Sequence, residues 1–264
     1  MTISTSTSEK VHWTLRIACA MCFIGHGAWG IITKAEWLPF FHVVGISDAL
    51  GWKLMPLIGI MDISLGIWIL FRPTRFVMVY LIVWGTWTAL LRPLSGMGWW
   101  EFLERAGNYG APLAFLVFSG MIARRADWFS PVRIPEFSQI PLERLKFVLK
   151  TAAMLLLVGH GGFEAFQHKP MLMDHWQAVG LPVAETDPIA FGAFVGWFEI
   201  LLGLAIFFKP TPGLALCVVG WKLLTESLYV IHGPFCWQIF EFIERGGSYG
   251  VPLALYFLTN TKRK

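Results

Sequence analysis

Two histidines and two carboxylic acids lie inside long apolar stretches of this sequence. His26 and His160 are each flanked by glycine, and Asp62 and Glu199 each stand three residues after one glycine and four before another. A carboxylate at membrane depth costs about 2.5–3.5 kcal/mol, and imidazoles carry protons or bind metals, including haem iron. We therefore predict that His26, His160, Asp62 and Glu199 are catalytic residues, and that His26 and His160 are candidate metal ligands. Hydrogen bonding that only fixes helix packing is the alternative.

A longer polar motif occurs twice. Glu-Phe-x-Glu-Arg-x-Gly-x-Tyr-Gly-x-Pro-Leu-Ala begins at Glu101 and again at Glu241. Its two glutamates are three residues apart and share a helical face, and the start of the following helix favours an anion or a polarised oxygen. We predict a ligand or substrate site here, with local ion pairing that seals the loop as the alternative. The candidate substrate-binding residues are Glu101, Glu104, Arg105, Tyr109, Glu241, Glu244, Arg245 and Tyr249.

The two copies of the sequence differ at one notable pair of positions. Arg92 in the first copy corresponds to Tyr229, whereas Ala89 corresponds to Glu226. If these stretches meet at the centre of the protein, Arg92 and Glu226 pair across it and make a two-fold site asymmetric. We add both to the candidate substrate-binding residues. An arginine that extends its charge to the lipid headgroups is the alternative for Arg92.

The elements that must position these residues form two copies of one unit. The copies are offset by 134 residues at His26 and His160 and by 140 residues at Arg105 and Arg245. Four apolar stretches per copy predict eight transmembrane helices in two fused parallel four-helix repeats, because an even number of spans preserves orientation. The predicted spans lie near residues 14–33, 51–71, 76–94, 110–124, 147–166, 190–208, 211–231 and 249–260.

The last span of each repeat is predicted to follow a break in the helix. Residues 110–123 extend only about 21 Å at ~1.5 Å per residue, which is short of a bilayer core. Glycines relax the backbone here, and Pro112 and Pro252 suit the first turn of a new helix. This pattern predicts a broken or re-entrant segment before the last helix of each repeat. An interfacial helix followed by a loop and a short tilted span is the alternative.

The overall composition is typical of an all-α integral membrane protein. Hydrophobic residues make up 56% and charged residues 14%, against about 25% charged in soluble domains. The predicted partner is therefore the lipid bilayer. No basic stretch is interleaved with aromatic residues in the way that tracks a nucleic-acid backbone, so no nucleic-acid partner is expected.

Basic residues predict the orientation of the chain. They are concentrated at Arg124, Arg125 and Arg133, around the start of the linker, and at Lys262 and Arg263 near the C-terminus. The positive-inside rule then places the linker and both termini in the cytoplasm, for a multi-pass protein of the bacterial inner membrane. The predicted units are a first repeat in residues 1–125, a cytoplasmic linker in 126–146 and a second repeat in 147–264.

The order of signals in each half resembles the DoxX-like family of small four-helix membrane proteins. Residues 15–27 are similar to that family's first helix, with an arginine followed by His-Gly, and residues 59–75 are similar to its second helix, with a central acid. The second half matches at residues 159–161 and 196–209. The resemblance implies a tandem duplication of a DoxX-like unit. It also implies membrane redox chemistry, since relatives are linked to quinone-coupled sulfur oxidation.

The predicted function is redox-linked, at an outward-facing polar site on the interface between the repeats. The ligand is expected to be a quinone or another lipid-soluble molecule, with a metal or haem at the paired histidines as a further hypothesis. The sequence leaves open whether the protein is a membrane oxidoreductase or a subunit of one. Two alternatives remain: a transporter or channel for a small anion or acid, and a non-catalytic accessory subunit of a membrane complex.

Overall fold

The computed structural model of the chain describes residues 3–120, 125–168, 170–180, 187–232 and 235–261, and these residues form helices and no strand. The first half contains α1 (Ile3–Ile32), η1 (Ala35–Trp37), α2 (Leu38–Val43), α3 (Asp48–Phe71), α4 (Arg75–Leu94), α5 (Trp99–Glu104) and α6 (Ala106–Phe118). The linker contains η2 (Arg125–Trp128) and η3 (Phe137–Gln139). The second half contains α7 (Leu142–Gly162), a π-helical turn η4 (Phe163–Gln167), α8 (Pro170–Ala178), α9 (Pro188–Phe208), α10 (Pro212–His232), α11 (Phe235–Glu244) and α12 (Gly246–Thr259).

In the part of the chain that the structure describes, six helices are long and apolar enough to cross a membrane, namely α1, α3, α4, α7 with its π turn, α9 and α10. The prediction of an all-α, multi-pass membrane protein is therefore confirmed. The fourth and eighth predicted spans correspond to α6 and α12, which have only 13 and 14 residues. Residues 121–124, where the fourth span was predicted to end, and the basic residues Lys262 and Arg263 lie outside the described residues.

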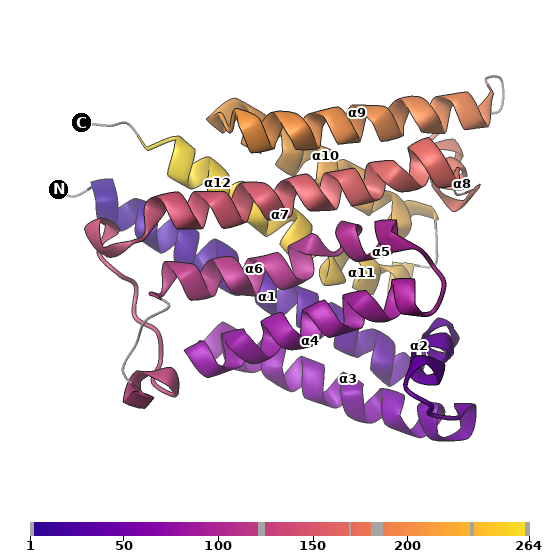
Figure 1. Cartoon of the computed structure of the whole chain (residues 1–264), viewed down its shortest axis with the longest axis horizontal. Coiled ribbons are helices and arrows are strands. Elements are labelled where there is room, and N and C mark those ends of the chain that lie inside the picture. The colour runs from indigo at the N-terminus through magenta and orange to yellow at the C-terminus, as the bar shows by residue number, and fades with distance from the viewer. Residues whose placement is uncertain (1–2, 121–124, 169, 181–186, 233–234, 262–264) are drawn as a thin grey trace.

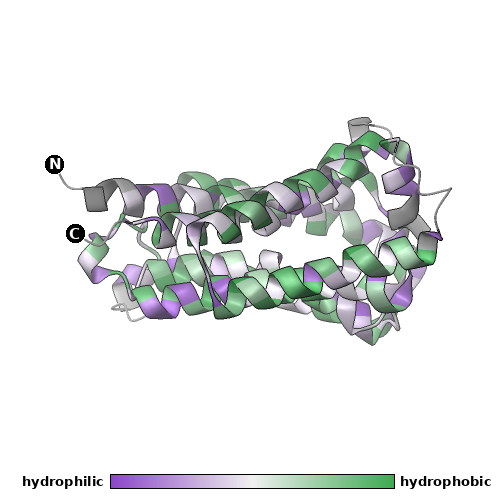
Figure 2. Cartoon of the chain, turned by 90° about the horizontal axis from the view of Figure 1, so that it is seen from above, coloured by the Kyte–Doolittle hydropathy of each residue, from purple (hydrophilic) through white to green (hydrophobic). Residues whose placement is uncertain are grey.

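The long helices run side by side along one axis, and both termini lie at the same end (Figure 1). α1 and α7 begin at that end and lead to the short helices α2 and α8 at the other. Hydrophobic residues cover most of the length of the helices (Figure 2). Large apolar side chains such as Phe71, Phe194 and Phe208 are exposed on this surface, as expected of helices that face lipid.

Each half packs its first long helix closely against its second. A Cβ atom added to Gly27 of α1 would come within 2.6 Å of the carbonyl oxygen of Gly59 in α3. In the second half, a Cβ atom on Gly161 of α7 would overlap the carbonyl oxygen of Gly196 in α9. Only glycine allows two helix backbones to approach so closely, so these glycines hold each histidine-bearing helix against the helix that carries the acid.

The halves also exchange contacts. α1 packs against α11 and α12 of the second half, and α7 packs against α5 and α6 of the first. The two exchanged segments meet where α6 and α12 cross, and a Cβ atom on Gly107 would lie 2.8 Å from the carbonyl carbon of Gly247. Each half therefore completes its core with the last helices of the other.

The helix break lies earlier than predicted. Arg105 alone separates α5 from α6, and Arg245 alone separates α11 from α12. Pro112 and Pro252 stand inside α6 and α12 rather than in their first turns. A proline removes one backbone hydrogen bond, but the packing of α6 and α12 at the centre of the bundle keeps both helices continuous through it.

Candidate functional site

The first histidine forms a hydrogen bond with the first membrane acid. His26 Nδ1 of α1 lies 2.7 Å from Asp62 Oδ2 of α3, and the Asp62 side chain is fully buried. The indole ring of Trp37 stacks on the imidazole with 4.5 Å between ring centroids. This pair joins two of the predicted catalytic residues, which are 36 positions apart in the sequence.

The second half repeats the pair with a longer acid. His160 Nδ1 of α7 lies 2.5 Å from Glu199 Oε2 of α9. The other carboxylate oxygen of Glu199 accepts a hydrogen bond from Trp221 Nε1 at 2.6 Å. Both His–acid pairs are therefore products of the same helix packing, and a carboxylate that holds Nδ1 fixes the imidazole in one orientation.

Neither histidine lies in a metal cluster. Within the ranges that the structure describes, no group of three or more His, Cys, Asp or Glu side chains is arranged to hold a metal ion. Each histidine instead uses Nδ1 to bond an acid of its own half. Haem or metal ligation by His26 and His160 stays a prediction that these contacts do not favour.

A cavity of about 200 Å³ opens beside the first His–acid pair. Its walls come from α1, η1, α2, α3 and α4, and most of them are aromatic or aliphatic. The polar groups in the wall belong to His26, Thr88 and Arg92, and the indole of Trp84 lies among them. An apolar chamber with a few convergent polar groups is the usual form of a site for a small organic ligand.

Arg92 and Glu226 do not pair, so that expectation is wrong. Arg92 lines the cavity and lies 5.0 Å from the ring centroid of Phe40, while its Nε is buried with no hydrogen-bond partner among the described residues. Glu226 instead forms ion pairs with Lys222 at 2.7 Å and with Arg245 at 2.6 Å. The two residues belong to different helices, α4 and α10. Glu226 pairs with cations of its own half, whereas Arg92 faces the cavity of the first half.

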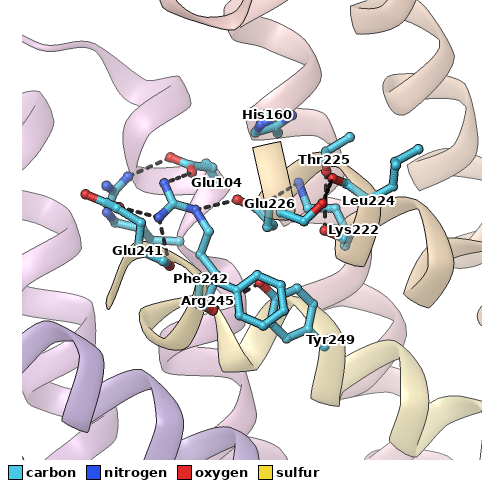
Figure 3. A network of polar contacts seen from close by, with 12 residues as sticks. Glu104, His160, Lys222, Leu224, Thr225, Glu226, Glu241, Phe242, Arg245 and Tyr249 are labelled. Carbon is cyan, nitrogen blue, oxygen red and sulfur yellow. Dashed lines mark hydrogen bonds and ion pairs between the residues drawn. The ribbon is translucent and has the colours of Figure 1, made fainter. Parts of the chain in front are cut away.

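A buried network of charged side chains links the second His–acid pair to the helix breaks (Figure 3). Lys222 lies 3.9 Å from Glu199 and continues through Glu226 to Arg245. Arg245 also contacts Glu241 at 2.5 Å and Glu104 of the other half at 3.5 Å. Alternating signs compensate charges that would otherwise be very costly in a buried setting.

Ion pairs also form within the first-half motif and between the two halves. Arg105 contacts Glu101 at 3.0 Å and Glu104 at 2.6 Å, and Lys34 contacts Glu241 at 2.5 Å. The space left at the centre measures about 10 Å³, which is about the room of one water molecule. It is lined by three equivalent pairs of residues, Glu104 and Glu244, Arg105 and Arg245, and Asn108 and Ser248.

Tyr109 and Tyr249 brace the breaks. The Tyr109 hydroxyl donates to the carbonyl oxygen of Phe102 at 3.3 Å, and the Tyr249 hydroxyl donates to that of Phe242 at 3.0 Å. Both tyrosine rings also pack against the phenylalanine whose carbonyl they bond. The duplicated motif thus has a well-defined structural role, and ion pairing within it accounts for the arginines and for Glu101, Glu104 and Glu241.

The second half has the short helix α8 at the position that corresponds to the cavity of the first half. His175 of α8 packs edge-on against Tyr229, and Trp176 packs against Trp221. Burial, followed in effect by the neighbouring His232 and Arg245, lowers the pKa of His175 to about 4. His175 is therefore neutral at pH 7.

Several site residues were not singled out from the sequence. Trp37 precedes the short helix α2, and nothing in its spacing relates it to His26. Lys34 belongs to no repeated motif, so the sequence does not relate it to Glu241. Trp84 and Trp221 occupy equivalent positions in the two copies of the sequence, and that shared tryptophan is the one signal that points to a place beside the acid.

Comparison with known proteins adds no assignment: no protein family, no curated protein and no solved structure gives a significant match to this chain. The DoxX-like resemblance therefore stays a prediction.

Proposed function

We propose that this protein binds a small lipid-soluble molecule with an oxygen-bearing ring, of the quinone class, in the cavity beside His26 and Asp62. The observation that carries the proposal is the cavity itself: about 200 Å³, mostly apolar, next to a His–acid pair within membrane-spanning helices. A flat ring suits the aromatic walls formed by Trp37, Phe40 and Trp84.

The polar wall of the cavity fits such a ligand. Arg92 is half-buried in the cavity wall, its Nε is buried without a hydrogen-bond partner in the described structure, and a ring oxygen is an acceptor for the guanidinium. With Asp62 ionised, His26 keeps its proton on Nδ1, and Nε2 is the nitrogen that accepts another. When bound, the ring supplies the oxidation and reduction chemistry, while these residues bind it, orient it and hold its proton.

The proposal includes the finer architecture that the sequence predicted. α5 with α6, and α11 with α12, act as broken fourth and eighth passes, so that two DoxX-like four-helix repeats (residues 1–125 and 147–264, joined by the linker 126–146) lie parallel in a bacterial inner membrane. Both termini and the linker are cytoplasmic, and the cavity opens toward the outer side. Single cysteines placed at Ser6 and Ser47 test this orientation with a membrane-impermeant thiol reagent, since only the second is expected to react in intact cells.

The experiment that tests binding is a titration of the purified protein with decylubiquinone. Quenching of tryptophan fluorescence reports occupancy, because Trp37, Trp84 and Trp87 line the cavity. Arg92→Gln is expected to weaken binding about tenfold, since a hydrogen bond from a charged group contributes about 1.5–3 kcal/mol. Arg72→Gln is the matched control, because Arg72 is exposed at the far end of α3. Absence of saturable quenching in the wild-type protein contradicts the proposal.

Transport of a small anion is the second candidate, and it rests on the arginines at the helix breaks. Its support is weaker, because Arg105 and Arg245 already contact carboxylates and the central space is water-sized. Chloride or acetate uptake by proteoliposomes that is lost in Arg105→Gln would favour it. An accessory role in a membrane complex gains if neither ligand binding nor uptake is found.

A further inference from the structure

The two His–acid pairs differ in one contact that the repeat would lead one to expect in both halves. In the second half, Glu199 Oε1 accepts the indole N–H of Trp221 at 2.6 Å. In the first half, the equivalent atoms are Asp62 Oδ1 and Trp84 Nε1, and both are buried without a hydrogen-bond partner in the described structure. The hydrogen bond between acid and indole is therefore formed in the second half and is not formed in the first.

The difference has a simple covalent origin. Aspartate is one methylene shorter than glutamate, which withdraws its carboxylate by about 1.5 Å. Asp62 and Glu199 are offset by the same 137 residues as Trp84 and Trp221, so Asp62 and Trp84 occupy the positions of α3 and α4 that correspond to the bonded pair in the second half. The shorter side chain of Asp62 bonds His26 at 2.7 Å but does not extend to Trp84, whose indole N–H is left without an acceptor in the described structure.

The two open atoms require a specific kind of group between them. The indole N–H of Trp84 is only a donor, and an ionised carboxylate is only an acceptor. A group that satisfies both must accept one hydrogen bond and donate another, which a hydroxyl does and a carbonyl oxygen does not. Trp84 lines the cavity, and so does His26, the hydrogen-bond partner of Asp62, so an occupant of the cavity lies beside the groups that flank this gap.

We propose that the gap between Asp62 and Trp84 is a hydroxyl-binding subsite, and that the cavity therefore selects a hydroxyl-bearing ring, a hydroquinone or related phenol, over the corresponding carbonyl-bearing ring. The ligand hydroxyl accepts from Trp84 and donates to Asp62, whose other oxygen is held by His26. The second half has no such subsite, because Glu199 and Trp221 satisfy each other. This inference rests on the proposed function, since it specifies which form of the ligand the same cavity binds.

Ligand binding tests the selectivity. Decylubiquinol, decylubiquinone and the dimethyl ether of decylubiquinol are titrated into the purified protein under anaerobic conditions. The quinol is expected to bind at least tenfold more tightly than the other two, and Trp84→Phe is expected to remove that preference. Trp221→Phe is the matched control and retains it, because Trp221 bonds Glu199 outside the cavity. A dimethyl ether that binds as tightly as the quinol overturns the subsite and leaves only a water molecule in the gap.

A second experiment needs no ligand. Asp62→Glu restores the missing methylene, and the Trp84 indole resonance in ¹⁵N-tryptophan spectra is expected to move downfield toward that of Trp221, with assignment from the Trp84→Phe variant. The Asp62→Glu variant should also lose the preference for the quinol. If the Trp84 resonance does not move, the assignment of a gap between Asp62 and Trp84 is wrong, even if a ligand binds in the cavity. If it moves but the wild-type protein binds none of the three probes, the gap is real, whereas the proposed function and the subsite's role both fail.

Discussion

Gly159 of α7 lies directly against the backbone of Glu104, at the point where α5 ends in the other half of the chain. The reciprocal contact joins Gly25 of α1 to the backbone of Glu244, where α11 ends. Each glycine immediately precedes a histidine of a His–acid pair. The contacts that join the two halves therefore also set the position of both imidazoles.

Substitution of Gly159 by alanine should destabilise the protein. The added Cβ atom would overlap the backbone of Glu104, which cannot move as a flexible side chain would. We expect a loss of about 1–3 kcal/mol of folding free energy, as for other overpacked interiors. Thermal unfolding in detergent measures it. Gly220→Ala is the control, because a Cβ atom there meets nothing within 4 Å, and equal losses in both variants would contradict the close contact.

Removal of the Arg245 charge should cost more than removal of the Arg92 charge. Arg245 contacts Glu226 at 2.6 Å and Glu241 at 2.5 Å, so Arg245→Gln removes one of the two cations that compensate each of these buried carboxylates. Breaking a buried pair in this way costs about 3–5 kcal/mol. Arg92→Gln is expected to change stability by less than about 1 kcal/mol, because no carboxylate pairs with Arg92 in the described structure. Chemical denaturation of both variants, followed by circular dichroism, distinguishes the two; similar losses would show that the network is not stabilised by its pairing.

Lys222 and Glu226 should be energetically coupled. They are four residues apart on α10, 2.7 Å from each other, and both side chains are 1% exposed. A double-mutant cycle of Lys222→Met and Glu226→Gln is expected to give a coupling energy above about 1 kcal/mol. The pair of Glu143 and Lys146 is the control, since Glu143 is 86% exposed and such surface pairs give about 0.2–1 kcal/mol. Equal coupling in the two pairs would argue against a buried network.

Acid should destabilise the protein through His175. Burial lowers its folded-state pKa to about 4, below the usual 6.5, so the unfolded chain binds the proton more readily. The contribution of His175 is complete above about pH 6.5 and is lost as the pH falls from there toward 4. Thermal unfolding between pH 7.5 and 5 should therefore show a steeper loss in the wild-type protein than in His175→Asn, by roughly 1–2 kcal/mol at pH 5. Parallel pH profiles would contradict the buried, neutral state of this histidine.

Much of the site could be predicted from residue type and spacing. Ionisable residues are costly in apolar helices, so His26, Asp62 and their counterparts stand out against their surroundings, and recurrence of the same pattern in both halves marks the positions at which helices pack. The glycines beside these residues can be predicted as packing positions too, because two helices approach closely only where glycine stands. These are local properties, and a single sequence carries them.

The tertiary structure decided which polar groups meet. The spacing within α10 already places Lys222 and Glu226 on one face, but the rotation of α10 determines that this face meets Arg245 rather than Arg92, and no spacing within one helix reveals that. The break falls at Arg105 because packing across the two halves keeps α6 helical through Pro112. The open gap at Asp62 depends on one methylene and on the separation of α3 and α4. The sequence by itself determined the polarity and period of each helix, whereas contacts between residues a hundred or more positions apart arise only when the helices pack, because packing sets distances that the covalent chain leaves free.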